Sequence, residues 1–419
     1  MLLVICFAIG YLAIVFEHPL RVNKTVSALI MGVICWTVLV TDHDSAHLNE
    51  QLLHHFAGIA QIVFFLLGAM VIVELIDAHD GFELITSRIT TTSRRKLLLV
   101  ISILSFLLSA VLDNLTTSIV MISLVRKLTA DDNDRLNFGG IVIIAANAGG
   151  VWSPIGDVTT TMLWVGNQVT TTGLLSTLIV PALVCVSVPI AWVMIRLKGN
   201  ITRPEIVETR TTTPSTAGER TLVFSVGTAV LVFVPVFKTL TGLPPVMGIL
   251  LGLGVLWAVT EVMHKNKNDG SRSALSAAGA LQRIDSQSVL FFLGILLAIG
   301  ALETAGTLRQ LSGFFDREIG NIDAITLTIG LSSAVIDNVP LVAASQGMYP
   351  IETFGTDHHF WLFLAYCAGT GGSILIIGSA AGIAVMGIQR ITFGAYVKRF
   401  SLPALLGYFA GALAYLAMR

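Results

Sequence analysis

A six-residue segment occurs twice in this chain, once in each half of the sequence. Residues 109–114 read Ser-Ala-Val-Leu-Asp-Asn, and residues 333–338 read Ser-Ala-Val-Ile-Asp-Asn. Both copies lie within long apolar stretches, where a charged side chain costs roughly 2.5–3.5 kcal/mol on insertion scales. A chain that accepts this cost at matching places in two halves is most simply explained as a transporter that binds an ion at the paired acids.

The composition is that of a polytopic membrane protein. Of the 419 residues, 54% are hydrophobic and 12% are charged, and the mean hydropathy is +0.82. Soluble domains carry about 25% charged residues. About 20 apolar residues cross a bilayer, and the expected spans are 1–16, 26–41, 59–77, 138–168, 173–197, 221–237, 243–263, 287–304, 360–388 and 402–418. The first span has no basic leader region or small-residue cleavage site, so we expect it to be retained.

Two further apolar regions, 97–128 and 324–349, contain the repeated segment and are predicted to be re-entrant hairpins. From Thr116 to Val125, only ten residues remain before Arg126. Ten helical residues reach about 15 Å, which is half of a hydrocarbon core of about 30 Å. The run from Asn338 to Tyr349 is similarly short. We therefore expect each Asp-Asn pair at a hairpin tip, buried in protein or lining a cavity.

The distribution of basic residues supports this topology. We place the N-terminus outside and let both hairpins return to the side from which they enter. The predicted inside segments then hold 21 of the 25 Lys and Arg residues, and the outside segments hold only Lys238, Arg309, Arg317 and Arg419. This is the bias that the positive-inside rule requires. A single crossing by either hairpin would invert everything after it and remove the bias.

The expected fold is all-α, with two inverted repeats that each hold about five transmembrane helices, one re-entrant hairpin and one broken helix. An odd number of crossings in each half makes the repeats inverted. The predicted domains are the first repeat at 1–198 (hairpin 97–128, broken helix 138–168), the cytoplasmic linker at 199–220, and the second repeat at 221–419 (hairpin 324–349, broken helix 360–388).

Each hairpin is followed by a glycine-broken segment that suits a small cation. Gly149, Gly150 and Gly156 align without a gap with Gly371, Gly372 and Gly378. Glycine pairs loosen a helix and free backbone carbonyls, and hard cations prefer oxygen ligands. The predicted ion- and proton-binding residues are Asp113, Asn114, Thr116, Thr117, Asn147, Asp157, Thr159, Thr160, Asp337, Asn338, Ser373 and Ser379.

Some of these residues have a structural alternative. An intramembrane Asp can serve as the partner of another helix, and Thr159, Thr160 and Ser373 can bond to their own helix. Glu74 and Glu303, near opposite ends of their spans, are candidate proton relays, although snorkelling to the interface explains them equally well. His43, His47, Glu50 and His54 fit a solvated amphipathic helix better than a pH sensor or a metal site.

Several motifs together resemble the NhaD-type sodium/proton antiporters of the ion transporter superfamily, over nearly the whole chain. The matching segments are Phe-Leu-Leu-Gly-Ala-Met at 65–70, Val-Glu-Leu-Ile-Asp-Ala-His at 73–79, Leu-Asp-Asn-Leu-Thr-Thr at 112–117, Asn-Ala-Gly-Gly at 147–150, Ser-Pro-Ile-Gly-Asp at 153–157 and Ile-Asp-Asn-Val-Pro at 336–340. The set is specific, although arsenite and organic-anion carriers of the superfamily share versions of the Gly-Gly and Ile-Gly-Asp pattern.

The resemblance implies secondary exchange of Na⁺, and also of Li⁺, for H⁺, without a cofactor. It further implies a homodimer with a scaffold and a moving transport domain, and a role in pH homeostasis. The expected location is the bacterial inner (cytoplasmic) membrane, since the chain shows no transit segment. Nothing in the sequence points to a nucleic acid partner.

The expected mechanism is competition at one site, where Asp113, Asp157 and Asp337 bind either Na⁺ or protons and titrate as a set. The first alternative is an anion or arsenite carrier of the same superfamily, whose site would favour neutral donors and helix N-termini. An enzyme is not expected. An intramembrane aspartyl protease would need Gly at position 154, where this chain has Pro154, and no HExxH motif is present.

Overall fold

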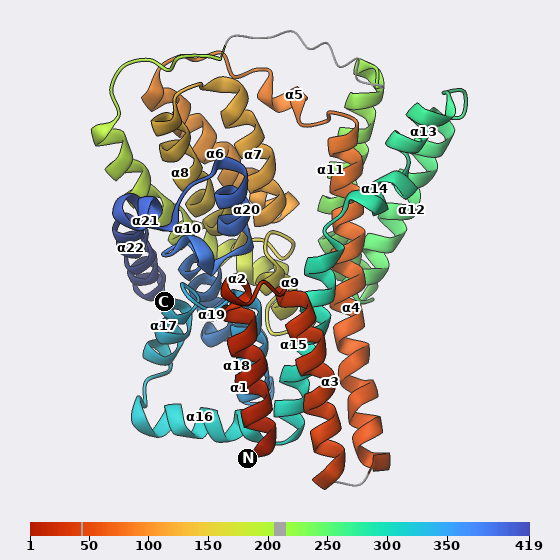
Figure 1. Ribbon diagram of the computed structural model, residues 1–419, viewed down its shortest axis with the longest axis vertical. Coiled ribbons are helices and arrows are strands. Elements are labelled where there is room, and N and C mark those ends of the chain that lie inside the picture. Colours follow the sequence, from red (N-terminus) through yellow and green to blue (C-terminus); the bar gives the residue numbers. More distant parts are fainter. Residues whose placement is uncertain (43–44, 205–214) are drawn as a thin grey trace.

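The computed structural model describes residues 1–42, 45–204 and 215–419, and every regular element in these ranges is a helix (Figure 1). Within them, eight helices are long and apolar enough to cross a membrane, which confirms the predicted all-α membrane fold. These spans fall on α3 (Lys24–Asp42), α4 (Ser45–Ala78), α6 (Arg94–Leu112), α10 (Thr171–Arg196), α11 (Ala217–Thr241), α12 (Pro245–Met263), α15 (Ser286–Thr304) and, with the turns before it, α22 (Leu402–Met418).

The remaining apolar helices, except for the 19-residue α8, are shorter, and they mostly occur as interrupted pairs. They are α1 (Leu2–Val15), α7 (Asn114–Leu128), α8 (Asp132–Gly150), α9 (Val158–Val165), α17 (Ile322–Ser332), α18 (Asn338–Met348), α19 (His359–Gly371) and α20 (Ala380–Gln389). At 1.5 Å per residue, the 15 residues of α7 and the 11 residues of α18 reach roughly 22 and 17 Å, less than a hydrocarbon core of about 30 Å. These are the short second arms that the hairpin prediction requires.

Figure 1 shows the helices gathered into two bundles that each combine both halves of the chain. The first bundle comprises α1, α3, α4, α11, α12 and α15, and the second comprises α6, α7, α8, α10, α17, α19, α20 and α22. Helices α9 and α18 connect them, because α18 packs on both α9 and α15 and α9 packs on α4. The predicted linker lies only partly within the described residues, since residues 205–214 are outside them.

The second bundle is built around two helices that are buried on every side. All residues from Phe138 to Gly150 of α8 and from Phe360 to Gly371 of α19 are buried. A helix that is apolar all round belongs in the centre of a bundle. Both central helices end in the glycine pairs that the sequence singled out, so the bundle places both glycine breaks in its interior.

Two of these glycines let neighbouring backbones touch. A Cβ added to Gly149 would lie 2.2 Å from the carbonyl oxygen of Phe106, and one added to Gly371 would lie 2.0 Å from that of Gly330. Phe106 and Gly330 each stand seven positions before an Asp of the repeated segment. Small residues allow such close helix crossings, and here they bring each hairpin against a central helix.

Short helices complete the chain: α2 (Glu17–Leu20), α5 (Glu83–Thr86), α13 (Asp269–Leu275), α14 (Ala277–Arg283), α16 (Thr307–Glu318) and α21 (Phe393–Tyr396), with the single turns η1 (Ile376–Gly378) and η2 (Val397–Ser401). The helix expected around His47, Glu50 and His54 forms the first part of α4, whereas His43 lies outside the described residues. Helix α16, which the sequence analysis did not anticipate, lies at the same end of the molecule as the N-terminus (Figure 1).

Candidate ion-binding site

Four helix N-termini begin at the breaks of the interrupted pairs, and each is capped by a predicted site residue. Asp113, Asp157, Asp337 and Ser379 cap α7, α9, α18 and α20, and their side chains accept hydrogen bonds from the backbone N–H groups of Thr116, Thr159, Val339 and Gly382. Asp and Ser are favoured caps because they satisfy N–H groups that lack a helical partner. The positive end of the helix dipole also stabilises a carboxylate there.

Asn147 of α8 is the centre of a buried amide–hydroxyl network that joins the two halves of the chain. Its Oδ1 accepts a hydrogen bond from Asn114 Nδ2 at 3.0 Å. Its Nδ2 donates to Ser373 Oγ at 2.9 Å and to Ser379 Oγ at 3.0 Å. All four side chains are buried, so the structure brings these four predicted site residues together.

Asp157 occupies the matching place on the other side of the site. Its side chain is buried, and Oδ2 accepts a hydrogen bond from Asn338 Nδ2 at 3.2 Å. A Cβ added to Gly369 would lie 3.3 Å from the same oxygen. In the gap-free glycine alignment, position 147 corresponds to 369 and position 157 to 379. The contact between Asn147 and Ser379 is thus equivalent to that between Gly369 and Asp157. In the second pair the carboxylate faces a glycine, which adds no side chain.

Asp113 has an unusual backbone. Its φ is +70° and its ψ is 162°, a region that L residues rarely adopt and that costs of order 1–3 kcal/mol. Its carboxylate accepts hydrogen bonds from Thr116 N at 2.8 Å and from Thr116 Oγ1 at 2.9 Å. Such strain persists where surrounding contacts enforce it, and it is concentrated at functional sites.

The threonines near the acids divide into two kinds. Thr117 Oγ1 and Thr159 Oγ1 are buried and have no hydrogen-bond partner among the described residues. Buried hydroxyls of this kind are costly unless something binds them. Thr160 Oγ1, in contrast, donates to the carbonyl oxygen of Asp157 at 2.9 Å, so its hydroxyl is used within its own helix turn.

Asp337 differs from the other two acids because it faces a cation. Lys24 Nζ, at the start of α3, lies 3.7 Å from Asp337 Oδ2, and both side chains are about one-fifth exposed (23% and 21%). The same ammonium lies 4.5 Å from the ring centre of Phe291. These groups line a cavity of about 210 Å³ together with Tyr11 and Glu17. The sequence analysis missed Lys24, a lone cation 313 positions before its partner.

The serine that begins each copy of the repeated segment fixes a hairpin to a central helix. Ser109 Oγ donates to the carbonyl oxygen of Ala146 at 2.6 Å, and Ser333 Oγ donates to that of Ala368 at 2.9 Å. The repetition itself was the signal for these residues, although the sequence analysis concentrated on the acids. Tyr396, also missed, donates its hydroxyl to the carbonyl oxygen of Ser373 at 2.7 Å.

The two candidate relay acids lie outside this network. Glu74 forms an ion pair with Arg283. Glu303 lines a cavity of about 780 Å³ whose walls also include His54, Met162 of α9 and Gln346 of α18. Among the described residues, no group of three or more His, Cys, Asp or Glu side chains is placed to hold a metal ion. The described part of the His-rich segment is included in that statement, whereas His43 lies outside the described residues.

Comparison with known proteins supplies the family. The profile described as "Citrate transporter" matches residues 11–358. "Sodium/proton antiporter 1" of Arabidopsis thaliana is 49% identical over 98% of this chain and 71% of its own length. The "Na(+)/H(+) antiporter NhaD" of Vibrio parahaemolyticus is 29% identical over 92% of this chain and 98% of its own length.

A solved structure shares the fold. The crystal structure of the YdaH transporter of Alcanivorax borkumensis superimposes with a TM-score of 0.56 and 13% identity over 97% of both chains. The expected resemblance to NhaD-type antiporters is confirmed by the named relatives. This chain belongs to the citrate-transporter family and is similar to plant sodium/proton antiporters and bacterial NhaD proteins.

Proposed function

We propose that this protein is a secondary antiporter that exchanges Na⁺ for H⁺, with Asp157 at the centre of its site. One observation carries the proposal: three of the four helix N-termini at the site are capped by carboxylates. Exposed helix N-termini are ready sites for anions, but here acidic side chains take that place. The site is therefore suited to a cation and to protons, as the names of the relatives suggest.

The family description as a citrate transporter raises the main alternative. A citrate carboxylate within about 4 Å of a site carboxylate would be repelled by about 4 kcal/mol at an effective dielectric constant of 20. Asp113 and Asp157, for which the described part of the chain shows no basic partner, would each contribute such a repulsion, whereas Lys24 lies beside Asp337. An anion or arsenite carrier would instead need neutral donors at these caps, so the alternative is disfavoured by the residues of this chain.

Cation binding would use buried side-chain oxygens at the helix breaks. The Asp157 carboxylate, the Asn338 amide and the unpartnered hydroxyls of Thr117 and Thr159 are the oxygen ligands that a hard ion prefers. Protonation of the carboxylates removes the charge that attracts Na⁺, so the two substrates compete. Because the acids interact, they would titrate as a set rather than singly.

The wider picture follows the same proposal. The first bundle would act as the scaffold, and the second, which carries α8 and α19, would move to expose the site alternately to each side. Li⁺ would share the Na⁺ site, and two chains would pair through their scaffolds as a homodimer. No covalent chemistry is needed, so we propose no enzymatic activity. We propose the bacterial cytoplasmic membrane as its location, although the relatives include plant proteins.

Reconstituted liposomes with a trapped pH dye provide the test. After a pH gradient is imposed, addition of NaCl or LiCl should discharge it, whereas choline chloride should not. Asp157→Asn should abolish this response while the protein remains monodisperse. Discharge by citrate but not by Na⁺ would overturn the proposal in favour of an anion carrier.

A further inference from the structure

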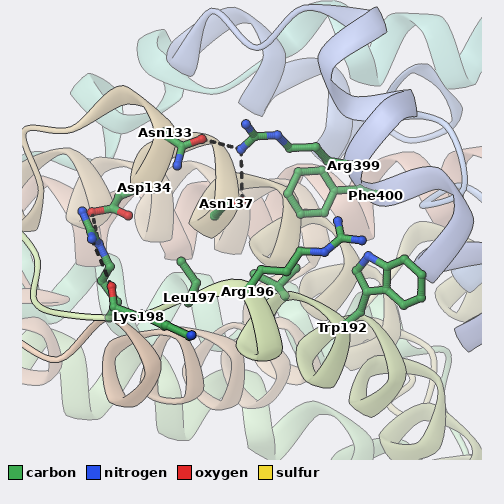
Figure 2. A pocket seen from close by; sticks show the side chains of 11 residues that line it. Asn133, Asp134, Asn137, Trp192, Arg196, Leu197, Lys198, Arg399 and Phe400 are labelled. Carbon is green, nitrogen blue, oxygen red and sulfur yellow. Dashed lines mark hydrogen bonds and ion pairs between the residues drawn. The ribbon is translucent and has the colours of Figure 1, made fainter.

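A cavity of about 410 Å³ lies in the second bundle, away from the ion site, at the predicted cytoplasmic ends of several helices (Figure 2). Its walls come from the start of α6, the first turns of α8, the end of α10 and the turn η2. Four cationic side chains and one carboxylate line it, together with two amides and two aromatic rings: Arg94, Arg196, Lys198, Arg399, Asp134, Asn133, Asn137, Trp192 and Phe400.

The single carboxylate is already neutralised. Asp134 is buried, and its Oδ2 accepts a hydrogen bond from Arg94 Nε at 2.9 Å. The same guanidinium also donates to the carbonyl oxygen of Lys198 at 3.1 Å. The Arg94–Asp134 pair therefore connects α6 and α8 to the end of α10. Because Asp134 is already paired, it does not neutralise the positive charges of the other cations in the cavity.

Neutral groups position the two remaining arginines. Arg399 donates to the amide oxygens of Asn133 and Asn137, and the guanidinium of Arg196 lies 4.8 Å from the ring centre of Trp192. Neither arginine lies within ion-pair distance of a carboxylate in the described part of the chain. Figure 2 shows both side chains at the same cavity, with Lys198 also on its wall. The cavity thus carries an excess of positive charge that is held in place by uncharged partners.

The surroundings identify the chemistry that would neutralise this charge. Ile195, next to Arg196, is 73% exposed, and Leu402, shortly after Arg399, is 53% exposed. The cations therefore stand at the border between the basic end of the protein and its apolar wall, and Trp192 is a residue type that favours the membrane interface. Basic pockets between helices on the cytoplasmic side bind phosphate head groups of anionic lipids.

We propose that this cavity binds the phosphate head group of an anionic phospholipid. The guanidinium forks of Arg196 and Arg399 contact the phosphate oxygens, a pairing that arginine makes in bidentate fashion, and Lys198 adds a third positive charge. The acyl chains lie along the exposed apolar faces of α10 and α22. A bound head group would bridge α10 to the turn that precedes α22, and so join the ends of the two halves of the chain. This inference does not depend on which ion the protein transports.

The test measures lipid binding directly on the full-length protein. Purified protein is titrated with dioleoylphosphatidylglycerol or dioleoylphosphatidylcholine, and retained lipid is counted by native mass spectrometry. We expect retention of the anionic lipid only. Each basic residue near an anionic surface strengthens lipid binding about fivefold. The double variant Arg196→Gln with Arg399→Gln should therefore weaken lipid retention about 10- to 30-fold.

Matched variants make the result specific. Lys398→Gln removes one charge from the neighbouring exposed position, which does not line the cavity, and should retain lipid as the unmodified protein does. Arg399→Lys keeps the charge but loses the fork, so its retention should be intermediate. Equal retention of both lipids by the unmodified protein would overturn the proposal, as would unchanged retention in the double variant. Inorganic phosphate that displaces the lipid completely at low concentration would identify a soluble anion as the ligand instead.

Discussion

The ion pair between Lys24 and Asp337 makes a quantitative prediction about cation affinity. At the observed 3.7 Å, the Coulomb attraction is about 4.5 kcal/mol at an effective dielectric constant of 20. Desolvation of both groups and their partial exposure to water reduce the net value to roughly 1–2 kcal/mol. If Na⁺ must displace the ammonium from Asp337, Lys24→Gln should lower the half-saturating Na⁺ concentration about 5- to 30-fold.

The assay is Na⁺-driven discharge of a pH gradient in liposomes, with the initial rate measured over a range of Na⁺ concentrations. Lys24→Arg keeps a cation beside Asp337 and should stay close to the unmodified protein. Lys265→Gln removes a charge from an exposed inner position that has no contact with the site, so it controls for a change of surface potential. Only the variant that frees Asp337 should move the half-saturating concentration.

One result would refute this reasoning. If Lys24→Gln left the half-saturating Na⁺ concentration unchanged while the protein stayed folded and active, Asp337 would not be a cation ligand. The ion pair would then be a structural link between α3 and α18. A loss of exchange in Asp337→Asn would not by itself show that Asp337 is a cation ligand, because that variant also removes the helix cap of α18.

Three further predictions concern folding and stability. Gly149→Ala places a Cβ 2.2 Å from a carbonyl of α6 and should abolish the folded protein in size-exclusion chromatography, whereas Gly254→Ala, with nothing within 4 Å, should not. Asn147→Ala leaves several buried polar groups unpaired and should destabilise the protein by roughly 1–3 kcal/mol for each lost partner, read from thermal unfolding in detergent. Burial, with the Lys267 ammonium nearby, lowers the pKa of His264 from its ordinary 6.5 to about 4. Between these two pH values the unfolded chain therefore binds more protons, and the free energy of unfolding should fall as the pH drops from about 6.5 to 4. His264→Gln should reduce that fall. The same pH dependence of stability in His264→Gln and in the unmodified protein would contradict this prediction.

The sequence predicted the elements of the site better than their contacts. The repeated segment and the aligned glycines place the breaks at Asp113, Asp157 and Asp337, because charges and glycine pairs in apolar runs are local signals. The contact of Asn147 with Ser379 depends on how two helices from different halves cross. No local pattern encodes that crossing, even though the alignment makes this pair equivalent to the pair of Gly369 and Asp157.

The partners of isolated charges were the hardest to predict. In the sequence, Lys24 looks like an ordinary cation at the inner end of a span. It comes close to Asp337 because α3 and α18 both pack on α15. Glu74 is a candidate relay in the sequence, yet in the structure it pairs with Arg283, the last residue of α14. In both cases the charge lies near a helix end, where the sequence cannot distinguish a tertiary ion pair from a side chain that extends to water.

The charge of the site bears on the number of protons that are exchanged. Lys24 compensates Asp337, so within the described part of the chain Asp113 and Asp157 are the site carboxylates without a basic partner. Moving them through a region of low dielectric is least costly when both are protonated, and Na⁺ needs only their oxygens. Two protons would then exchange for one Na⁺, and each cycle would move one net charge. We therefore expect the exchange rate in liposomes to respond to a membrane potential imposed with K⁺ and valinomycin, and Lys24→Gln to change that response. A rate independent of the potential would mean that only one of the two carboxylates gives up its proton.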